Sequence, residues 1–282
     1  MQGLMYETLI NSTNLVALTP TAGHKIFDCR FNLADTWAGQ RAYDAGHIPS
    51  AYYLHLDNDL SSPITPASGR HPLPDTHQLA ARLAACGVTQ DTQIIVYDDN
   101  SGAFAARAWW LLRWMGHKAV AVLDGGWSAW LEQGGNLEQE TPPLPVAGNF
   151  AARLQAGAFL STSQLLGAHG MQLVDARSPE RFRGEVEPLD TVAGHIPGAY
   201  NRPLTDNLLD GAFKPAATLK AEWQALLGNT PAGKVVHMCG SGVTACHNLL
   251  AMEIAGISGS RLYAGSWSEW IRDTDRPIAK GA

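Results

Sequence analysis

The sequence contains Ala45-Gly46-His47-Ile48-Pro49-Ser50-Ala51-Tyr52, and this octapeptide returns later in the chain, with one substitution, as Ala193-Gly194-His195-Ile196-Pro197-Gly198-Ala199-Tyr200. Two more motifs recur in the same order around these segments. Asp28-Cys29-Arg30 returns as Asp175-Ala176-Arg177, and Gly125-Gly126-Trp127-Ser128-Ala129-Trp130 returns as Gly265-Ser266-Trp267-Ser268-Glu269-Trp270. A period of about 140 residues indicates two duplicated domains, because the repeats of solenoid proteins are much shorter.

Both copies alternate strand-like apolar runs with helical stretches. The first copy has strand-like runs at 93–97 and 119–123, with helical stretches at 78–85 and 103–115. The second copy has strand-like runs at 234–238 and 261–263, with helical stretches at 219–227 and 244–255. This alternation is typical of a parallel sheet covered by helices. We therefore predict an α/β protein with two tandem domains, each a central parallel β-sheet flanked by helices.

A stretch rich in glycine and proline separates the two copies. It runs from Gln133-Gly134-Gly135 through Pro142-Pro143-Leu144-Pro145. Glycine and proline at this density indicate turns and loops rather than a regular element. We predict a first domain at residues 1–140, a linker at 141–155 and a second domain at 156–282.

The composition excludes several classes of protein. The 282 residues are 45% hydrophobic and 16% charged, and the net charge is −6. No basic run is interleaved with aromatic residues, so we expect no nucleic-acid partner. No apolar stretch has the length of a membrane span, and the start, Met1 to Glu7, shows no evident signal peptide. Four cysteines (Cys29, Cys86, Cys239 and Cys246) are too few for a disulfide framework, so we expect a reducing, cytoplasmic location.

The loop that starts at Cys239 is the strongest candidate for chemistry. Cys239 ends an apolar run, two glycines, Gly240 and Gly242, follow within three residues, and a helical stretch comes next. Backbone N–H groups at such a strand–loop–helix junction form a cup that favours negative charge. The position therefore suits a thiolate, or an anion carried on one.

Four other readings of this loop are weaker. A buried structural cysteine rarely has this glycine-rich context. A dinucleotide-binding loop needs an acidic residue at the end of the next strand, and Arg261-Leu262-Tyr263 is followed by none. A cysteine phosphatase needs an arginine where this chain has Ala245. Cys239 and Cys246 lack the spacing of metal ligands. The remaining hypothesis is a persulfide, Cys–S–S⁻, whose outer sulfur the amides would stabilise.

The first copy lacks this thiol. With the offset of about 140 residues between the copies, Asp99 falls where Cys239 stands, in the segment Asp98-Asp99-Asn100-Ser101-Gly102. We therefore predict that the first domain is catalytically silent and that the chemistry belongs to the second.

In these motifs the sequence resembles the rhodanese superfamily, and most of all the 3-mercaptopyruvate branch of its two-domain sulfurtransferases. The resemblance covers nearly the whole chain. The loop Cys239-Gly240-Ser241-Gly242-Val243-Thr244-Ala245 is similar to that branch, whereas the thiosulfate branch typically carries Cys-Arg-Lys-Gly-Val-Thr-Ala. The resemblance implies two rhodanese folds with a cleft at their interface, and it implies that Cys239 is the persulfide-forming nucleophile.

The resemblance also suggests which groups bind the substrate. It implies that Arg181 holds a substrate carboxylate. We expect Gly240, Gly242, Val243 and Thr244, which form the cup, to bind the substrate as well. Ser241 could donate to the leaving carbonyl in catalysis or merely fit the tight turn. For Arg183 we expect an ordinary surface role. One departure concerns a second arginine, usual in a Glu-Pro-Arg segment of the family. This chain has Glu187-Pro188-Leu189-Asp190 instead, and Leu189 cannot hold a carboxylate.

The assignments of His47, Asp35 and Arg107 leave alternatives open. The family suggests that a first-domain histidine matching His47 assists Ser241 through an aspartate, for which Asp35 is the candidate. A structural role for His47 is the alternative, because His195 repeats it in the other copy. Arg107 could form an ion pair across the domain interface or lie on the surface.

The predicted activity is transfer of a sulfane sulfur from 3-mercaptopyruvate, through a Cys239 persulfide, to a thiol acceptor such as thioredoxin or a small thiol, or to cyanide, with release of pyruvate. Because Gly240 and Ser241 carry no charge, they favour this donor over the dianion thiosulfate. A thiosulfate sulfurtransferase of the same fold and a non-catalytic sulfur-carrier module remain the alternatives. We expect no cofactor and no metal.

Overall fold

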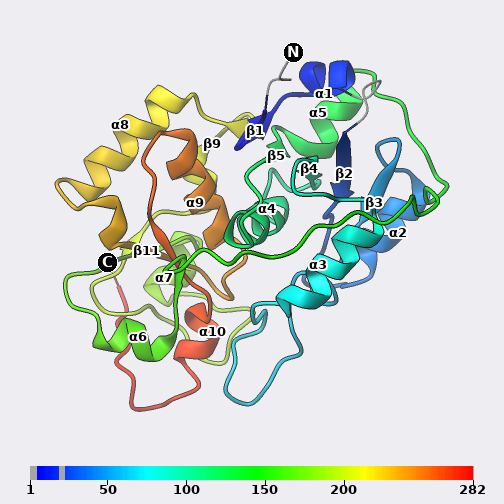
Figure 1. Cartoon of the computed structure of the whole chain (residues 1–282). Coiled ribbons are helices and arrows are strands. Elements are labelled where there is room, and N and C mark those ends of the chain that lie inside the picture. The colour runs from blue at the N-terminus through cyan, green and yellow to red at the C-terminus, as the bar shows by residue number, and fades with distance from the viewer. Residues whose placement is uncertain (1–4, 19–22, 282) are drawn as a thin grey trace. The chain divides into compact units, whose positions relative to one another are not determined.

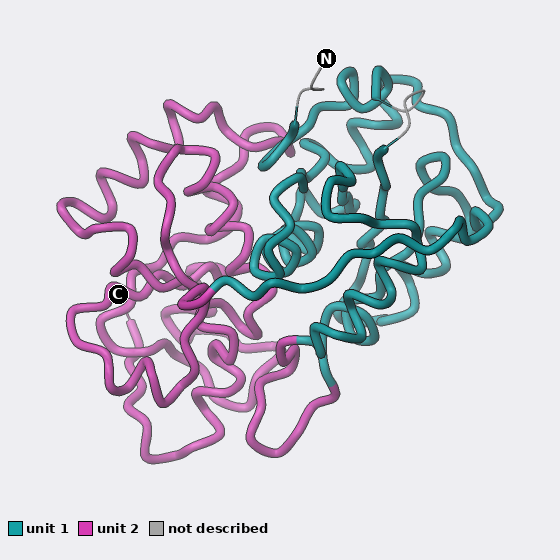
Figure 2. Tube along the Cα trace, in the orientation of Figure 1, with its two compact units in different colours: residues 1–62, 74–155 teal, residues 63–73, 156–282 magenta. Residues whose placement is uncertain are grey.

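A computed structural model describes residues 5–18 and 23–281 of the chain (Figure 1). The first four residues of the N-terminal segment discussed above lie outside the described residues. The chain divides into two compact units (Figure 2). Unit 1 comprises residues 1–62 and 74–155, and unit 2 comprises residues 63–73 and 156–282.

Unit 1 is built on a five-stranded parallel sheet with the strand order β1-β5-β4-β2-β3. Its strands are β1 (Leu9–Ile10), β2 (His24–Asp28), β3 (Ala51–Tyr53), β4 (Gln93–Tyr97) and β5 (Val120–Leu123). Its helices are α1 (Ser12–Leu18), α2 (Ala38–Ala45), α3 (Thr76–Ala85), α4 (Ala105–Trp114) and α5 (Gly126–Glu132). The central strand β4 is buried from Ile94 to Tyr97, as expected for a strand covered on both faces.

Unit 2 repeats this architecture, with the order β6-β12-β11-β7-β8 and parallel pairing throughout. The strands are β6 (Phe159–Leu160), β7 (Gln172–Asp175), β8 (Tyr200–Asn201), β11 (Val235–Met238) and β12 (Arg261–Tyr263). The helices are α6 (Thr162–Gly167), α7 (Pro179–Arg183), α8 (Ala216–Leu227), α9 (Ala245–Ile254) and α10 (Ser266–Trp270). Two 3-10 turns (Leu204–Asn207 and Ala232–Lys234) and a short antiparallel pair, β9 (Leu208–Leu209) with β10 (Ala212–Phe213), complete it. The predicted fold class is confirmed.

The three repeated motifs contact one another at the same place in each unit. In unit 1 the Arg30 guanidinium pairs with Asp28, donates to the Gly46 carbonyl oxygen at 2.7 Å and lies 4.4 Å from the centre of the Trp127 ring. Unit 2 repeats these contacts with Arg177, Asp175, Gly194 and Trp267. In each unit the repeated residues therefore join the end of one strand to the neighbouring glycine loop and to the tryptophan motif. This structural role explains why they recur in a copy that lacks the thiol.

The repeated histidines also have equivalent structural contacts. The Nδ1 atom of His47 lies 2.9 Å from the Tyr43 carbonyl oxygen, and its ring stacks on the Tyr43 ring at 3.9 Å. His195 repeats both contacts with Phe182, at 2.8 Å and 3.8 Å. Each histidine therefore joins its loop to the preceding helical segment, in agreement with the structural alternative for His47.

The two units are not continuous in sequence. Residues 63–73 belong to unit 2 although residues of unit 1 flank them on both sides, so unit 1 is discontinuous in sequence (Figure 2). The predicted linker groups with unit 1, where the Gly148 amide donates to the Ala84 carbonyl oxygen at 2.7 Å. Within the described ranges, no helix combines the length and the apolar character that crossing a bilayer requires.

Candidate active site

The Cys239 loop joins β11 to α9 and directs a backbone amide at the sulfur. The Gly242 amide donates to the Cys239 Sγ atom at 3.1 Å. The rest of the loop is held by two further bonds, because the Cys239 amide donates to the Ser266 Oγ atom and the Trp267 amide donates to the Cys239 carbonyl oxygen, at 3.1 and 3.0 Å. The cysteine is only 2% exposed. Its sulfur thus lies against a main-chain N–H group rather than in a wholly apolar environment.

Glycine is required at position 242. Its φ angle is +78°, and a Cβ atom there would lie 2.4 Å from the Ala264 carbonyl oxygen. Both features exclude a larger residue without a change of the backbone. Val243 and Thr244 complete the loop before α9 begins at Ala245. The four residues predicted to form the cup therefore lie together between the strand and the helix.

The corresponding position in unit 1 is Asp98, not Asp99. The Trp127 amide donates to the Asp98 carbonyl oxygen at 2.8 Å, as the Trp267 amide does to Cys239. The loop of unit 1, at 98–104, is one residue longer than the loop at 239–244. A constant offset therefore shifts the alignment by one residue, and the assignment of Asp99 is corrected.

The Asp98 side chain shows what this loop geometry can hold. The carboxylate is fully buried and accepts four backbone N–H bonds of 2.8–2.9 Å, from Asn100, Gly102, Phe104 and Ala105. Burial raises the pKa of the Asp98 carboxyl, and the four amides oppose this rise. In unit 1 the Asp98 carboxyl group fills the cup. The same loop in unit 2 carries the Cys239 sulfur, to which the Gly242 amide donates.

Ser241 is paired with His71. The Nδ1 atom of His71 lies 2.7 Å from the Ser241 Oγ atom, and both side chains are buried. This contact makes His71, and not His47, the histidine beside Ser241, and the relay alternative for His47 is corrected, because the His47 Nδ1 atom faces the Tyr43 carbonyl oxygen. Asp35 is corrected too, because its exposed carboxylate pairs with Arg41 instead of with a histidine.

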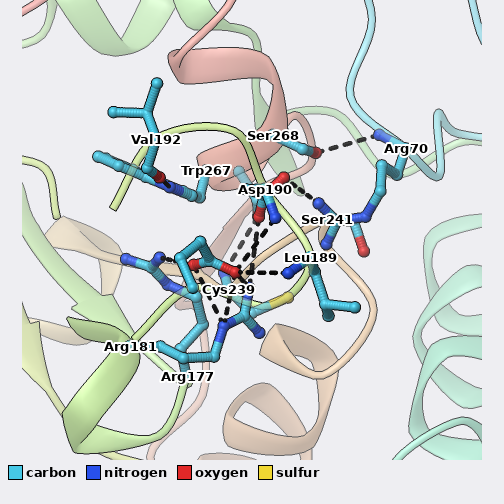
Figure 3. Close-up of polar contacts among 12 residues, drawn as sticks. Arg70, Arg177, Arg181, Leu189, Asp190, Val192, Cys239, Ser241, Trp267 and Ser268 are labelled. Atoms are coloured by element: carbon cyan, nitrogen blue, oxygen red, sulfur yellow. Dashed lines mark hydrogen bonds and ion pairs between the residues drawn. The ribbon is translucent and has the colours of Figure 1, made fainter. Parts of the chain in front are cut away.

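Two guanidinium groups lie over Gly240. A Cβ atom built on Gly240 would be 2.8 Å from Nη2 of Arg70 and 3.4 Å from Nη2 of Arg181. Figure 3 shows both arginines beside Cys239, together with Arg177, Asp190 and Leu189. Arg181 is the predicted carboxylate-binding residue. Arg70 was not predicted, because its segment repeats no motif of the other copy.

Carboxylates hold these arginines in place. Glu187 accepts from Arg181 at 2.8 Å and from Arg177 at 3.3 Å. Asp190 accepts from Arg181 at 3.3 Å and also pairs with Arg70. Leu189 contributes no charge, but its amide donates to Glu187 at 3.2 Å. A second arginine, Arg70, therefore approaches Gly240 beside Arg181 although position 189 is a leucine.

Charge at the site also acts on Arg177. Its burial acts to lower the guanidinium pKa, but Asp175, Glu187 and Cys239 outweigh burial, and the pKa is raised above its ordinary value. Arg177 is thus a permanently charged group near the sulfur. Arg183 pairs with exposed Glu185 away from this cluster, in keeping with the surface role expected for it.

Arg107 does not lie on the surface. It is fully buried on α4, and its Nη2 atom donates to the Leu60 carbonyl oxygen at 3.3 Å within unit 1. The surface alternative for Arg107 is therefore wrong.

The comparisons with known proteins agree with this geometry. A model of the rhodanese-like domain matches residues 12–133 and again residues 161–273. The chain belongs to the rhodanese family. Its rhodanese relatives include a probable 3-mercaptopyruvate sulfurtransferase of Pseudomonas aeruginosa, 48% identical over 97% of this chain and 98% of that protein. They also include a putative thiosulfate sulfurtransferase of Mycobacterium tuberculosis, 43% identical over 98% of both chains.

Solved rhodanese structures have the same two-domain fold. The 3-mercaptopyruvate sulfurtransferase from Leishmania major matches 94% of this chain and 74% of its own, with a TM-score of 0.83 and 29% identity. The 3-mercaptopyruvate enzyme SseA from Escherichia coli matches 93% of this chain and all of its own, with a TM-score of 0.79 and 32% identity.

Proposed function

We propose that this protein is a sulfurtransferase that takes sulfur from 3-mercaptopyruvate. The observation that carries the proposal is the position of two guanidiniums, those of Arg70 and Arg181, over the uncharged Gly240 beside the nucleophile. A planar carboxylate accepts two parallel N–H bonds from such groups. The relatives named 3-mercaptopyruvate sulfurtransferase support the same donor.

The first step transfers sulfur to the enzyme. The Cys239 thiolate attacks the sulfur of mercaptopyruvate, an S–S bond forms, and the C–S bond breaks. The electron pair of the broken bond leaves on the carbon as the pyruvate enolate, which a proton converts to pyruvate. Negative charge develops on the carbonyl oxygen, and a hydroxyl donor such as Ser241, backed by His71, stabilises it.

The second step returns the enzyme to its starting state. An acceptor thiolate, or cyanide, attacks the outer sulfur of the Cys239 persulfide, and the Cys239 thiolate leaves. Before this transfer the Gly242 amide and its neighbours stabilise the charged outer sulfur. Ping-pong kinetics follow from this sequence, because pyruvate leaves before the acceptor reacts. Thioredoxin, small thiols and cyanide are the acceptor classes that this chemistry accommodates.

The test combines mass spectrometry with a variant. Incubation with 3-mercaptopyruvate should add one sulfur atom to Cys239 and release pyruvate, and Cys239→Ser should do neither. Cys246→Ser is a matched control, because this second thiol is also buried but bonds to the Gly242 carbonyl oxygen instead of an amide. Pyruvate release by Cys239→Ser would refute the proposal.

Thiosulfate is the second candidate donor, because a relative 43% identical is named a putative thiosulfate sulfurtransferase. A comparison of kcat/KM for the two donors decides between them. If neither donor produces turnover and a separate desulfurase loads Cys239, the protein is instead a sulfur carrier.

A further inference from the structure

The charges around Cys239 are balanced within unit 2. Three arginines and three carboxylates form one connected set of ion pairs, namely Arg70, Arg177, Arg181, Asp175, Glu187 and Asp190. Figure 3 shows the arginines and Asp190 converging beside the sulfur. Because the formal charges of the set cancel, the subsite offers directed N–H donors without a surplus of positive charge.

Asp190 occupies a special position in this set. Among the described residues it is the carboxylate that pairs with both Arg70 and Arg181, the two guanidiniums over Gly240. Glu187 pairs instead with Arg177 and Arg181. The Asp190 side chain is 4% exposed, so solvent screens its charge only weakly.

We propose that Asp190 determines donor specificity, by reducing the positive charge of the arginine pair so that a monoanionic keto-acid thiol is favoured over a dianion such as thiosulfate. This inference rests on the proposed function of the site. The Coulomb energy between a sulfur-donor substrate and a nearby charged side chain scales with the net charge of the substrate. Removal of the negative charge at Asp190 therefore favours a dianion about twice as much as a monoanion.

The segment that carries Asp190 is held independently of its side chain. The amides of Leu189 and Asp190 both donate to the Glu187 Oε1 atom, each at 3.2 Å. Glu187 also keeps its own bonds to Arg181. In Asp190→Asn the side-chain oxygen can still accept from a guanidinium, so this variant changes the charge and largely preserves the geometry.

The experiment measures kcat/KM for 3-mercaptopyruvate and for thiosulfate in the full-length protein, with cyanide as acceptor. In Asp190→Asn we expect thiosulfate use to rise and the ratio of mercaptopyruvate to thiosulfate kcat/KM to fall by about tenfold. Asp190→Glu keeps the charge and should retain most of the wild-type ratio. If Asp190→Asn does not fold, Asp190→Ser provides a second neutral variant.

Glu185→Gln is the matched control. It removes one negative charge from the same segment, but Glu185 is exposed and pairs with Arg183 outside the set. In Glu185→Gln the ratio of mercaptopyruvate to thiosulfate kcat/KM should stay at the wild-type value. Equal losses for both donors in Asp190→Asn, with an unchanged ratio, would mean that Asp190 only maintains structure, and the inference would be overturned.

A second readout separates this inference from the proposed function. The rates at which iodoacetate, an anion, and iodoacetamide, its neutral analogue, alkylate Cys239 report the charge of the subsite without any turnover. The iodoacetate-to-iodoacetamide ratio should rise severalfold in Asp190→Asn, and an unchanged ratio would overturn the inference. If the wild-type protein releases no pyruvate from mercaptopyruvate, the proposed function fails, while this ratio still tests Asp190.

Discussion

The Nδ1 atom of His71 lies 2.7 Å from the Oγ atom of Ser241, although 170 positions separate the two residues in the chain. His71 belongs to the segment 63–73, whose flanking residues on both sides are part of unit 1. This segment brings the His71 imidazole to Ser241 of the Cys239 loop, two positions after the cysteine. The pair is therefore a candidate for supporting the leaving carbonyl.

We expect His71→Asn and Ser241→Ala each to lower kcat for 3-mercaptopyruvate by about 100-fold, because each variant weakens the donor to the developing enolate oxygen. Thiosulfate turnover should fall much less, since sulfite leaves without a carbonyl oxyanion. Steady-state assays of pyruvate and thiocyanate measure both effects. The double variant should be no slower than the single ones, and multiplied losses would show that the two side chains act separately.

His47→Asn should affect stability instead of catalysis. Its ring stacks on Tyr43 and bonds to the Tyr43 carbonyl oxygen inside unit 1. We expect loss of this buried hydrogen bond to lower the free energy of unfolding by about 1–3 kcal/mol. Urea unfolding gives the stability, and kcat per folded molecule gives the catalytic effect. A 100-fold lower kcat in a stably folded His47→Asn protein would instead favour the catalytic alternative for His47.

The features that could be predicted from the sequence are local or repeated. The strand at 93–97 is found with the predicted bounds, and the helix predicted at 244–255 is found at Ala245–Ile254. Their apolar runs are long enough to specify one element each. The position of Cys239 between a strand and a helix also follows from consecutive residues, so the proposed nucleophile could be located in the chain without any tertiary information.

The side chains beside Cys239 come from distant parts of the sequence. Arg70 and His71 lie in an irregular segment without an apolar period or a repeat, so neither a motif nor a hydrophobic pattern linked them to Cys239. The assignment of Asp99 failed for another reason, since one extra loop residue changes the alignment of the two copies. The asymmetry between the two sequence copies was the available signal: an arginine and a histidine occur together in a segment of the first copy that the second copy does not repeat.

Gly240→Ala tests the close approach of the two arginines. The added methyl group would meet Nη2 of Arg70 at 2.8 Å and displace that flexible side chain. We expect KM for 3-mercaptopyruvate to rise by about tenfold, as one charged hydrogen bond to the carboxylate is weakened, while kcat changes little. Gly242→Ala should behave differently and lose Cys239 reactivity, because its backbone cannot keep a φ of +78° at low cost. A normal KM in Gly240→Ala would show that Arg70 does not bind the carboxylate.

His237 links stability to pH. It lies fully buried on β11, two residues before Cys239, with its ring edge-on to Trp223 at 5.5 Å. Burial, assisted by the positive charge of Arg202, lowers its pKa from 6.5 to about 3. Between pH 6.5 and about 3, His237 is therefore neutral in the folded protein but protonated in the unfolded chain. Its contribution to the free energy of unfolding is fully present above pH 6.5 and is lost as the pH falls toward 3.

A pH series of urea unfolding curves, followed by tryptophan fluorescence, measures this loss. Between pH 7 and pH 5 we expect the His237 contribution to lower the free energy of unfolding by about 2 kcal/mol, since each pH unit below 6.5 costs about 1.4 kcal/mol. His237→Leu has no group at this position that binds a proton, so its free energy of unfolding should fall by about 2 kcal/mol less over this range. His169→Gln removes an exposed histidine of the same unit and should retain the wild-type dependence. If His237→Leu and the wild-type protein lose stability equally, protonation of His237 is not coupled to folding in this range.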